Sequence, residues 1–286
     1  EDDTRDQGAL SAHTYGPDDL ELGEAVAVDD LVDFKLNAEV LLLGTCYAPE
    51  AKPVKDCAVS IRLEDWSKTL RVTGHRAWTD KVLGAAMTEP APFTEMPLTW
   101  ANSFGGEGYD DNPVGKGFDG ALLPNIEHPK GIIAARGDRP EPAGFGPISP
   151  AWPQRHKLRG SAYGGDYATK RAPWYAEDFN WKFFSQAPAD QQLEGYLRGD
   201  EKLQLFNVHP EHATISTQLP GLRIRAFVRV LDSADGDGTL SEIPMVLDTL
   251  CPSPDAGVVF LTWRGLCPVG QADLLDVKTL LIASEP

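Results

Sequence analysis

Residues 100–129 read WANSFGGEGYDDNPVGKGFDGALLPNIEHP, and residues 142–155 read PAGFGPISPAWPQR. Between positions 101 and 160 there are 11 glycines and 8 prolines, about a third of that segment, against 50 in the 286 residues of the chain. Proline removes a backbone donor and glycine loses the most conformational entropy on folding, so this segment cannot form a long helix or strand. Six aromatic residues occur between positions 100 and 152, whereas disordered linkers are poor in aromatics. We therefore expect a long ordered loop region, held on a β framework by its aromatic rings.

The overall composition is that of a folded, acidic protein. Hydrophobic residues make up 42% and aromatic residues 9% of the chain, which is enough for a sizeable core. The formal net charge is −17, and this disfavours direct binding of nucleic acid because phosphates need a basic surface. The longest apolar run is strand-sized, well short of the ~18 residues of a membrane span. We therefore expect no nucleic-acid partner, no membrane partner and no signal peptide.

The acidic residues are concentrated at the start of the chain. The first 33 residues contain 11 acidic residues and one arginine. We expect residues 1–34 to form an acidic, loosely ordered arm that is solvated. An alternative is that this arm acts as an electrostatic handle for a basic partner. Residues 35–286 are then expected to form a single β-rich domain, although the length also allows two smaller ones.

The four cysteines favour a reducing compartment. Cys46, Cys57, Cys251 and Cys267 lie far apart in the sequence, and none belongs to a C-x-x-C pair. Such low usage is typical of buried thiols, so we expect a cytoplasmic protein. A disulfide between Cys46 and Cys57, across neighbouring strands, is the alternative.

Hydrophobic alternation predicts strands on both sides of the Gly/Pro-rich region. The run 38–46 has the composition of a buried strand, while 57–63 and 67–73 alternate with period two. The clearest alternation lies in 222–230, where Arg223, Arg225 and Arg229 share a face that is either solvated or a basic strip for a partner. Further strands are predicted near these positions: 203–208, 213–217, 243–249, 257–264 and 274–282.

The connections between the strands are short or irregular. Asp235-Gly236-Asp237-Gly238 predicts a hairpin turn. One or two short helices are expected within 163–193, with Pro188 opening a turn at residues 189–193. Strands without long intervening helices are typical of antiparallel packing. We therefore expect a mainly β, antiparallel β-sandwich-like fold with a long Gly/Pro-rich ordered loop region and a few short helices.

Three motifs resemble ligand sites, but each lacks a required part. His209 and His212 have the spacing of zinc ligands on a helix, yet Pro210 separates them. Residues 115–117 read Gly-Lys-Gly without the Ser or Thr of a phosphate-binding loop. Residues 233–242 imitate a calcium loop without its first Asp or last Glu. We expect turns at all three places, no metal site and no cofactor.

An enzymatic alternative rests on the acidic residues Glu107, Asp110 and Asp111, which lie close to Trp100 and Tyr109 in the sequence. Glycosidases hold two carboxylates beside aromatic rings that stack on the sugar. No G-x-S-x-G elbow supports a hydrolase triad. We expect no catalytic residues and therefore a protein that is not an enzyme, with a carbohydrate-active enzyme on a β-sandwich as the alternative.

A series of short motifs follows in order along residues 35–265. The motifs are Trp100, Phe104-Gly105-Gly106, Asn112-Pro113-Val114-Gly115-Lys116-Gly117-Phe118, Leu123-Pro124-Asn125-Ile126-Glu127, Pro142-Ala143-Gly144-Phe145-Gly146-Pro147, Trp152-Pro153-Gln154-Arg155, Asp178-Phe179-Asn180, Phe183-Phe184, Ala187-Pro188-Ala189-Asp190-Gln191-Gln192, Gly195-Tyr196-Leu197-Arg198-Gly199-Asp200-Glu201 and Leu219-Pro220-Gly221-Leu222. In these motifs the chain resembles a bacterial family, long classed as a domain of unknown function, of type VI secretion effector adaptors or chaperones encoded beside spike and PAAR-repeat genes.

The resemblance implies a cytoplasmic adaptor that binds an effector toxin, or its PAAR-linked region, and helps to load it onto the spike. The implied partners are therefore the effector and the PAAR or spike protein. Aromatic anchors on a rigid surface lose little entropy on binding, so we expect the contact surface in the Gly/Pro-rich loops. The residues predicted to form it are Trp100, Phe104, Tyr109, Asn112, Phe118, Phe145 and Trp152. Two alternatives remain: these residues only hold the loops in place, or the chain is a structural part of the secretion machine.

Overall fold

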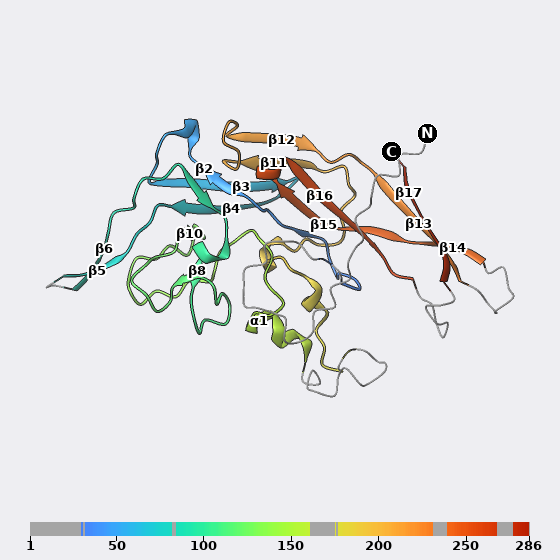
Figure 1. Ribbon diagram of the computed structural model, residues 1–286, viewed down its shortest axis with the longest axis horizontal. Coiled ribbons are helices and arrows are strands. Elements are labelled where there is room, and N and C mark those ends of the chain that lie inside the picture. Colours follow the sequence, from blue (N-terminus) through green and yellow to red (C-terminus); the bar gives the residue numbers. More distant parts are fainter. Residues whose placement is uncertain are drawn as a thin grey trace.

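The computed structural model describes residues 30, 32–81, 84–160, 175, 177–230, 239–267 and 277–285. Figure 1 shows an elongated molecule in which most strands form an upper layer and long loops pack beneath them. A hairpin of β5 and β6 lies at one end, and a small sheet of β13, β14 and β17 lies at the other. The bounds of these strands are β5 (Trp78–Lys81), β6 (Gly84–Met87), β13 (Arg223–Val230), β14 (Thr239–Ile243) and β17 (Val277–Glu285).

The central element is an antiparallel sheet of five strands in the order β10-β4-β3-β11-β12. The strands are β3 (Asp56–Leu63), β4 (Trp66–Thr73), β10 (Ile126–Glu127), β11 (Lys202–Phe206) and β12 (Thr214–Gln218). β3 and β4 pair along their whole length, from Asp56 opposite Thr73 to Leu63 opposite Trp66. The strands predicted before and after the Gly/Pro-rich region are thus neighbours in this sheet.

One face of the central sheet forms the main core. Side chains alternate between the two faces of a strand, and Val59 and Ile61 of β3 lie fully buried on the inner face. Leu70 and Val72 of β4 are fully buried beside them. β4 also carries Lys68 at an inward position, where its residue exposure is only 7%. The inner face is therefore apolar except for one charged group that must be neutralised.

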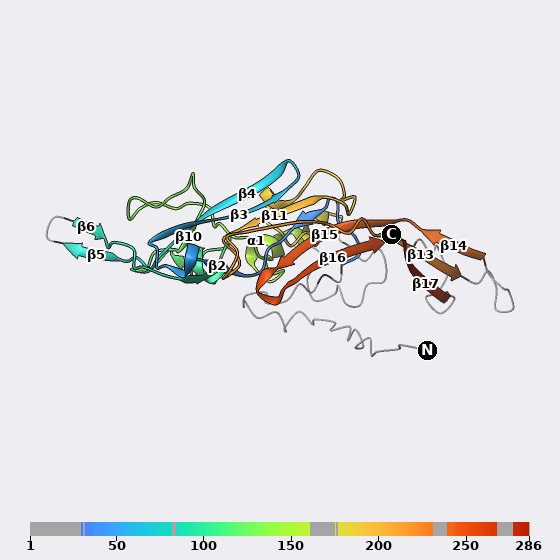
Figure 2. The ribbon, with the colours of Figure 1, turned by 90° about the horizontal axis from the view of Figure 1, so that it is seen from above.

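A second sheet joins the beginning of the described chain to residues 245–265. It contains β1 (Glu39–Val40), β15 (Met245–Ser253) and β16 (Val258–Gly265). β1 pairs in parallel with β15, and β15 pairs antiparallel with β16. Figure 2 shows β15 beside β11 of the central sheet, and Leu250 and Leu261 pack into the same core as Leu203. The strands predicted near 243–249 and 257–264 are confirmed.

The third sheet has three strands in the order β14-β13-β17, all antiparallel. The strand predicted at 222–230 is confirmed, and its Arg225 lies on the exposed side in an ion pair with Glu242 at 2.7 Å. The strand predicted at 274–282 is present as β17, which begins at Val277. The turn predicted at 235–238 lies outside the described residues.

The buried strand predicted at 38–46 is interrupted, which is a correction. The N–H of Leu41 donates to the carbonyl of Leu250 at 2.8 Å, whereas the N–H of Leu42 donates to the carbonyl of Phe145 at 3.1 Å. Residues 39–40 pair with β15, whereas residues 45–47 pair with residues 95–97, so the run changes its partner strand and is divided into two short strands. Leu41 and Leu42 are nevertheless fully buried, as their hydrophobicity suggests.

The remaining elements are short. The additional strands are β2 (Thr45–Tyr47), β7 (Glu95–Pro97), β8 (Phe104–Gly105) and β9 (Lys116–Gly117). The helices are η1 (Pro49–Ala51), η2 (Trp100–Asn102), α1 (Pro153–His156), η3 (Lys157–Arg159), η5 (Trp181–Phe184), η6 (Ala189–Gln191) and η7 (Pro254–Ala256). The expected mainly β, antiparallel fold with a few short helices is confirmed, and η6 follows Pro188 as predicted. None of the described helices combines the length and apolar character needed to cross a membrane.

The cysteines are reduced in the structure. All four are free, and Cys46, Cys57 and Cys251 are buried while Cys267 is half-buried. The buried thiols agree with the expectation from their low number. The disulfide between Cys46 and Cys57 is not formed.

A buried ionic network anchors the start of the described chain. Nζ of the fully buried Lys35 donates to Asp30 Oδ2 at 2.7 Å and to Glu39 Oε1 at 2.5 Å. The same Nζ donates to Thr249 Oγ1 of β15 at 2.7 Å. Arg264 of β16 donates from Nη2 to Asp30 Oδ2 at 3.0 Å. Burial raises the pKa of Glu39, and the charge of Lys35 opposes this shift. These contacts tie the segment before β1 to the sheet, whereas most of the predicted arm of residues 1–34 lies outside the described residues.

We predict that Lys35→Met lowers the free energy of unfolding by about 3–5 kcal/mol, because it leaves the buried Glu39 carboxylate without its cation. Urea denaturation of the purified chain measures this change. The matched control is Lys52→Met, whose ion pair with Glu50 is exposed on both sides, and we expect a change within about 0.5 kcal/mol. Equal stability of the two variants would contradict the buried network.

Candidate functional site

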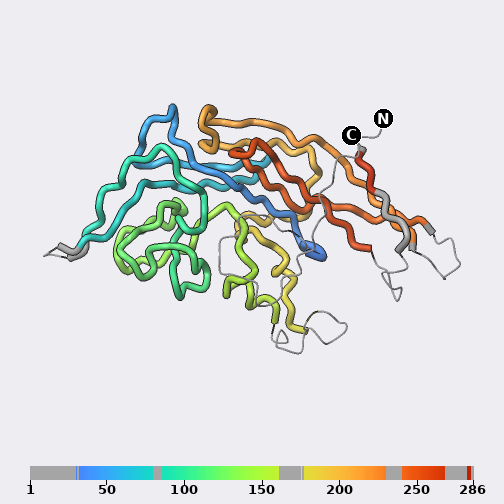
Figure 3. Tube along the Cα trace, viewed as in Figure 1, coloured from blue at the N-terminus to red at the C-terminus, as the bar shows by residue number. Residues whose placement is uncertain are grey.

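The Gly/Pro-rich segment folds into a compact block of loops under the inner face of the central sheet. Figure 3 shows this part of the chain, in green, returning several times beneath the blue strands. Trp100 lies at its centre, with an exposure of 4%. Its indole Nε1 donates to the carbonyls of Gly146 at 3.2 Å and Pro147 at 3.0 Å, and its ring meets that of Trp152 edge-on at 5.6 Å. One tryptophan thus joins three parts of the segment.

Asn112 ties the turns of the block together. Its side-chain Nδ2 donates to the carbonyls of Trp100 at 2.9 Å and Phe104 at 3.0 Å, and the residue is fully buried. The hydroxyl of Ser103 donates to the carbonyl of Ala143, which closes the block from the other side. Loops without regular ladders must satisfy their buried carbonyls by such side-chain donors. These contacts make the block a fixed structure.

Glycine is required at two close approaches in the block. A Cβ on Gly144 would lie 2.9 Å from the ring of Trp100. Gly105 has a φ of 153°, and a Cβ there would lie 2.1 Å from the carbonyl oxygen of Asn112. The glycine content read from the sequence therefore reflects tight packing as well as turns.

The seven predicted contact residues are mainly interior residues of this block. Five of them have exposures of 4% or less: Trp100, Phe104, Asn112, Phe145 and Trp152. Tyr109 and Phe118 are half-buried, and their rings lie 5.0 Å apart. This placement agrees with the alternative in which they hold the loops in place. Contact between this segment and a partner stays a prediction, and other residues of the block would have to provide the exposed atoms.

A pocket of about 480 Å³ opens where the loop block meets the central sheet. Its apolar walls are provided by Pro142, Ala143 and Ile148 of the loop block and by Pro188 and Ala189 beside η6. All except Ile148 belong to motifs that carry the family resemblance, and Trp100 and Gln154 of further motifs also line the pocket. Motifs far apart in the sequence therefore converge on one concave site.

Lys68 lies at the side of the pocket formed by β4. Its Nζ donates to the carbonyl of Gly144 at 2.7 Å, to Asp190 Oδ1 at 2.8 Å and to Gln191 Oε1 at 2.7 Å. Burial lowers the pKa of Lys68, and Asp190 opposes this shift. Three acceptors satisfy the three donors of an ammonium group. The lysine is therefore a structural tie between the sheet and the loops, with no donor left for a ligand.

Gln191 extends this tie toward the beginning of the chain. Its Nε2 donates to the carbonyl of Phe145 at 2.9 Å and to that of Val40 in β1 at 2.5 Å. One pair of side chains, Lys68 and Gln191, thus connects the central sheet, the loop block and β1. Both residues are buried.

The pocket is bordered by carboxylates. Asp111, Glu141 and Asp190 line it, together with His128 and the single cation Lys68. Asp111 and Glu141 also act on Tyr109, because burial raises the pKa of Tyr109 and the two carboxylates add to this shift. The pocket thus has an excess of negative charge.

The described geometry does not favour the carbohydrate-active alternative. Trp152 is fully buried and Trp100, which lines the pocket, is 4% exposed, so little of either ring is open for a sugar to stack on. Asp110 is used in an exposed ion pair with Lys157 at 2.6 Å. The carbohydrate-active alternative stays a prediction, because Tyr109 is half-buried and Asp111 lines the pocket.

No metal site emerges from the part of the chain that the structure describes, since it contains no group of three His, Cys, Asp or Glu side chains placed to hold an ion. His209 and His212 stack on each other at 4.8 Å in an exposed turn. Lys116 of the Gly-Lys-Gly run donates to Asn102 Oδ1 at 2.7 Å. Most of the calcium-like run lies outside the described residues.

A second group of motif residues surrounds α1 and η3. The ring of Phe183 lies between the guanidinium groups of Arg155, at 5.2 Å, and Arg159, at 4.7 Å. Phe34 packs against Trp181 at 5.0 Å and Phe184 at 5.6 Å between ring centroids. These contacts fasten η5 to the helix that follows Trp152.

Residues 4–264 of the chain match a protein family described as an uncharacterized protein conserved in bacteria, DUF2169. The chain belongs to the DUF2169 family. The match spans the loop block, both walls of the pocket and the sheets above them, so the fold described here is that of a DUF2169 protein. No similar curated protein and no similar solved structure was found for this DUF2169 chain.

The sequence interpretation missed the pocket residues Lys68, Glu141 and Asp190. One signal was available for Lys68, because it occupies an inward position in the alternating strand Trp66–Thr73. Asp190 belongs to a motif that carries the resemblance, but nothing in the sequence places it opposite β4. No local sequence pattern distinguishes Glu141 as a pocket residue.

We predict that Asn112→Ala lowers the free energy of unfolding by about 2–4 kcal/mol, because two buried carbonyls lose their donor. Gln154→Ala in the same block is the control, since this side chain is exposed, and we expect a change within about 0.5 kcal/mol. Thermal and urea unfolding provide the measurement. An Asn112 variant as stable as the control would show that the loops are not held in this way.

Proposed function

We propose that this DUF2169 chain is a cytoplasmic adaptor that binds a type VI secretion effector, or the PAAR-linked region of one, and helps to load it onto the spike. The proposal rests on one observation: several of the motifs in which the chain resembles the adaptor family line the same pocket, beside loops that are held in place by buried side chains. A preformed surface of this kind loses little conformational entropy when a partner binds. Such a surface suits recognition of another protein.

The chemistry of the pocket supports binding rather than catalysis. Lys68 Nζ donates hydrogen bonds to three protein acceptors, so it is not available as a nucleophile or a base. The apolar walls and the bordering carboxylates instead supply the features of a recognition site, in which apolar contact provides affinity and a few polar groups provide orientation. The net charge of −17 also favours encounter with a basic client.

We predict that the tagged full-length chain, expressed from its own locus, co-purifies with the effector or PAAR protein encoded beside it. Deletion of the gene should abolish secretion of that effector while leaving the other effectors of the same cell unaffected. Quantitative mass spectrometry of the purified complex and of the culture medium measures both results. Absence of the neighbouring protein from the purified material, together with normal secretion, would contradict the adaptor role.

Stoichiometry separates an adaptor from a structural part of the machine. A structural component is present in purified spikes in a fixed number, whereas an adaptor follows the amount of its client. We therefore expect the chain to be absent from spikes that are assembled in a strain without the client. A constant number of chains per spike in that strain would favour the structural alternative.

A further inference from the structure

Two carboxylates of the pocket are not held in direct contacts, although the pKa of Lys157, raised by its hydrogen bond with the neighbouring Asp110, is raised further by the charge of Asp111. Asp111 is half-buried and Glu141 is exposed, and neither forms an ion pair or a hydrogen bond with any residue that the structure describes. Asp190, in contrast, is paired with Lys68 at 2.8 Å. These two lining carboxylates are therefore available to a ligand.

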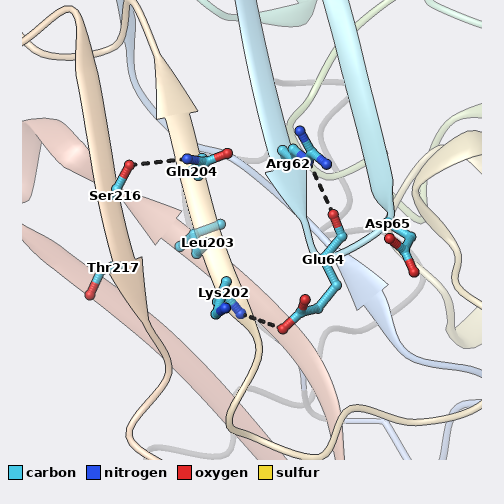
Figure 4. Close-up of a pocket in the computed structure, with 8 residues that line it drawn as sticks. All are labelled: Arg62, Glu64, Asp65, Lys202, Leu203, Gln204, Ser216 and Thr217. Carbon is cyan, nitrogen blue, oxygen red and sulfur yellow. Dashed lines mark hydrogen bonds between the residues drawn. The ribbon is translucent and has the colours of Figure 1, made fainter.

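A second pocket provides an internal comparison. Figure 4 shows a pocket of about 450 Å³ on the outer face of the central sheet, at the turn between β3 and β4. It is lined by two acids, Glu64 and Asp65, and by two bases, Arg62 and Lys202. Glu64 accepts from the backbone N–H of Lys202 at 2.9 Å, and Arg62 donates to the backbone carbonyl of Glu64 at 3.1 Å. The two pockets have similar volumes, but only the one beside the loop block carries an unbalanced charge.

The walls of the acidic pocket define the kind of cation that fits it. A metal ion would need several converging ligands, and no such group occurs among the described residues. Pro142, Ile148 and Pro188 instead surround the site with apolar surface. Lysine and arginine side chains combine a methylene stem, which packs on apolar walls, with a charged head that pairs with carboxylates.

We propose that the pocket between β4 and the loop block receives an arginine or lysine side chain of a protein partner, with Asp111 and Glu141 binding the cationic head. This inference rests on the proposed function in one respect, since it takes the partner to be the effector client. The stem of the bound side chain packs against Pro142 and Pro188, and the head remains near the mouth, where the two free carboxylates lie. The site therefore selects a basic residue on an exposed segment of the client.

The pocket is tested first with a small probe. N-acetyl-arginine amide is titrated into the ¹⁵N-labelled full-length chain at low salt, and N-acetyl-citrulline amide serves as the uncharged isostere. We expect shifts of pocket resonances with the arginine probe only, and at least tenfold weaker binding to the double variant Asp111→Asn/Glu141→Gln. The double variant Glu64→Gln/Asp65→Asn, which removes the same charge from the comparison pocket, should bind as the wild type does.

Three outcomes of this titration would overturn the proposal: no binding of the arginine probe, equal binding of the citrulline probe, or equal loss of affinity in both double variants. Asp111 and Glu141 have no described partner, so their replacement should leave the fold intact, and circular dichroism checks this. If the double variant does not fold, Glu141→Gln alone replaces it, because Glu141 is exposed. A lysine probe, N-acetyl-lysine amide, then shows which of the two cations is preferred.

The same variants separate this inference from the proposed function. We expect at least a tenfold loss of the co-purified client with Asp111→Asn/Glu141→Gln and no loss with Glu64→Gln/Asp65→Asn. If the wild type and both variants retain the client equally, the pocket inference is wrong while the adaptor role stands. If the wild type retains no client but the arginine probe binds as described, the adaptor role is wrong while the pocket remains a site for a basic side chain.

Discussion

The ammonium group of Lys68 lies on the buried face of the central sheet, and the loops that cover this face are arranged around it. A charge in that position is unfavourable unless acceptors surround it. The carbonyl of Gly144 comes from the loop block, while Asp190 and Gln191 come from η6, and together they provide the three acceptors. Gln191 then reaches the carbonyls of Val40 and Phe145. A single inward lysine thus fixes where the loop block, η6 and β1 meet, and the pocket lies at that meeting point.

This arrangement explains why a segment so rich in glycine and proline is ordered. The loops satisfy their backbone carbonyls with buried side chains such as Asn112 and Trp100, in place of a ladder. Their aromatic residues pack together and provide apolar contacts, which backbone hydrogen bonds alone would not supply. The result is a preformed concave surface with apolar walls and free carboxylates. Binding to such a surface requires little reorganisation, which is the physical basis of the adaptor role proposed above.

The sequence predicted the fold well where the signal is local. Period-two alternation located β3, β4 and β13, and the composition of the 100–155 segment predicted ordered loops with aromatic residues. The sequence failed where the outcome depends on tertiary partners. The run 38–46 is as apolar as a strand, but it changes its partner strand from β15 to β7 within the run, and this cannot be read from hydrophobicity.

The candidate site likewise contains residues that the sequence distinguishes and residues that only the fold brings together. Trp100 and Asn112 stand out in the sequence as unusual residues in a loop; both are buried, Trp100 at the wall of the pocket, and their contact with a partner stays a prediction. The free carboxylates Asp111 and Glu141 are ordinary acidic residues in the sequence. They become distinctive only because the fold places them beside the same pocket, 30 positions apart in the chain. The proposed binding site depends on that long-range placement.

Hydrogen–deuterium exchange of the full-length chain, with and without the proposed effector client, tests the central claim most directly. The account predicts that residues 100–155 exchange slowly in the free chain, because the loop block is already fixed. It also predicts that binding of the effector adds protection around Asp111, Glu141 and η6. Rapid exchange of the loop block in the free chain, or protection confined to a distant surface, would contradict a preformed binding site at this place.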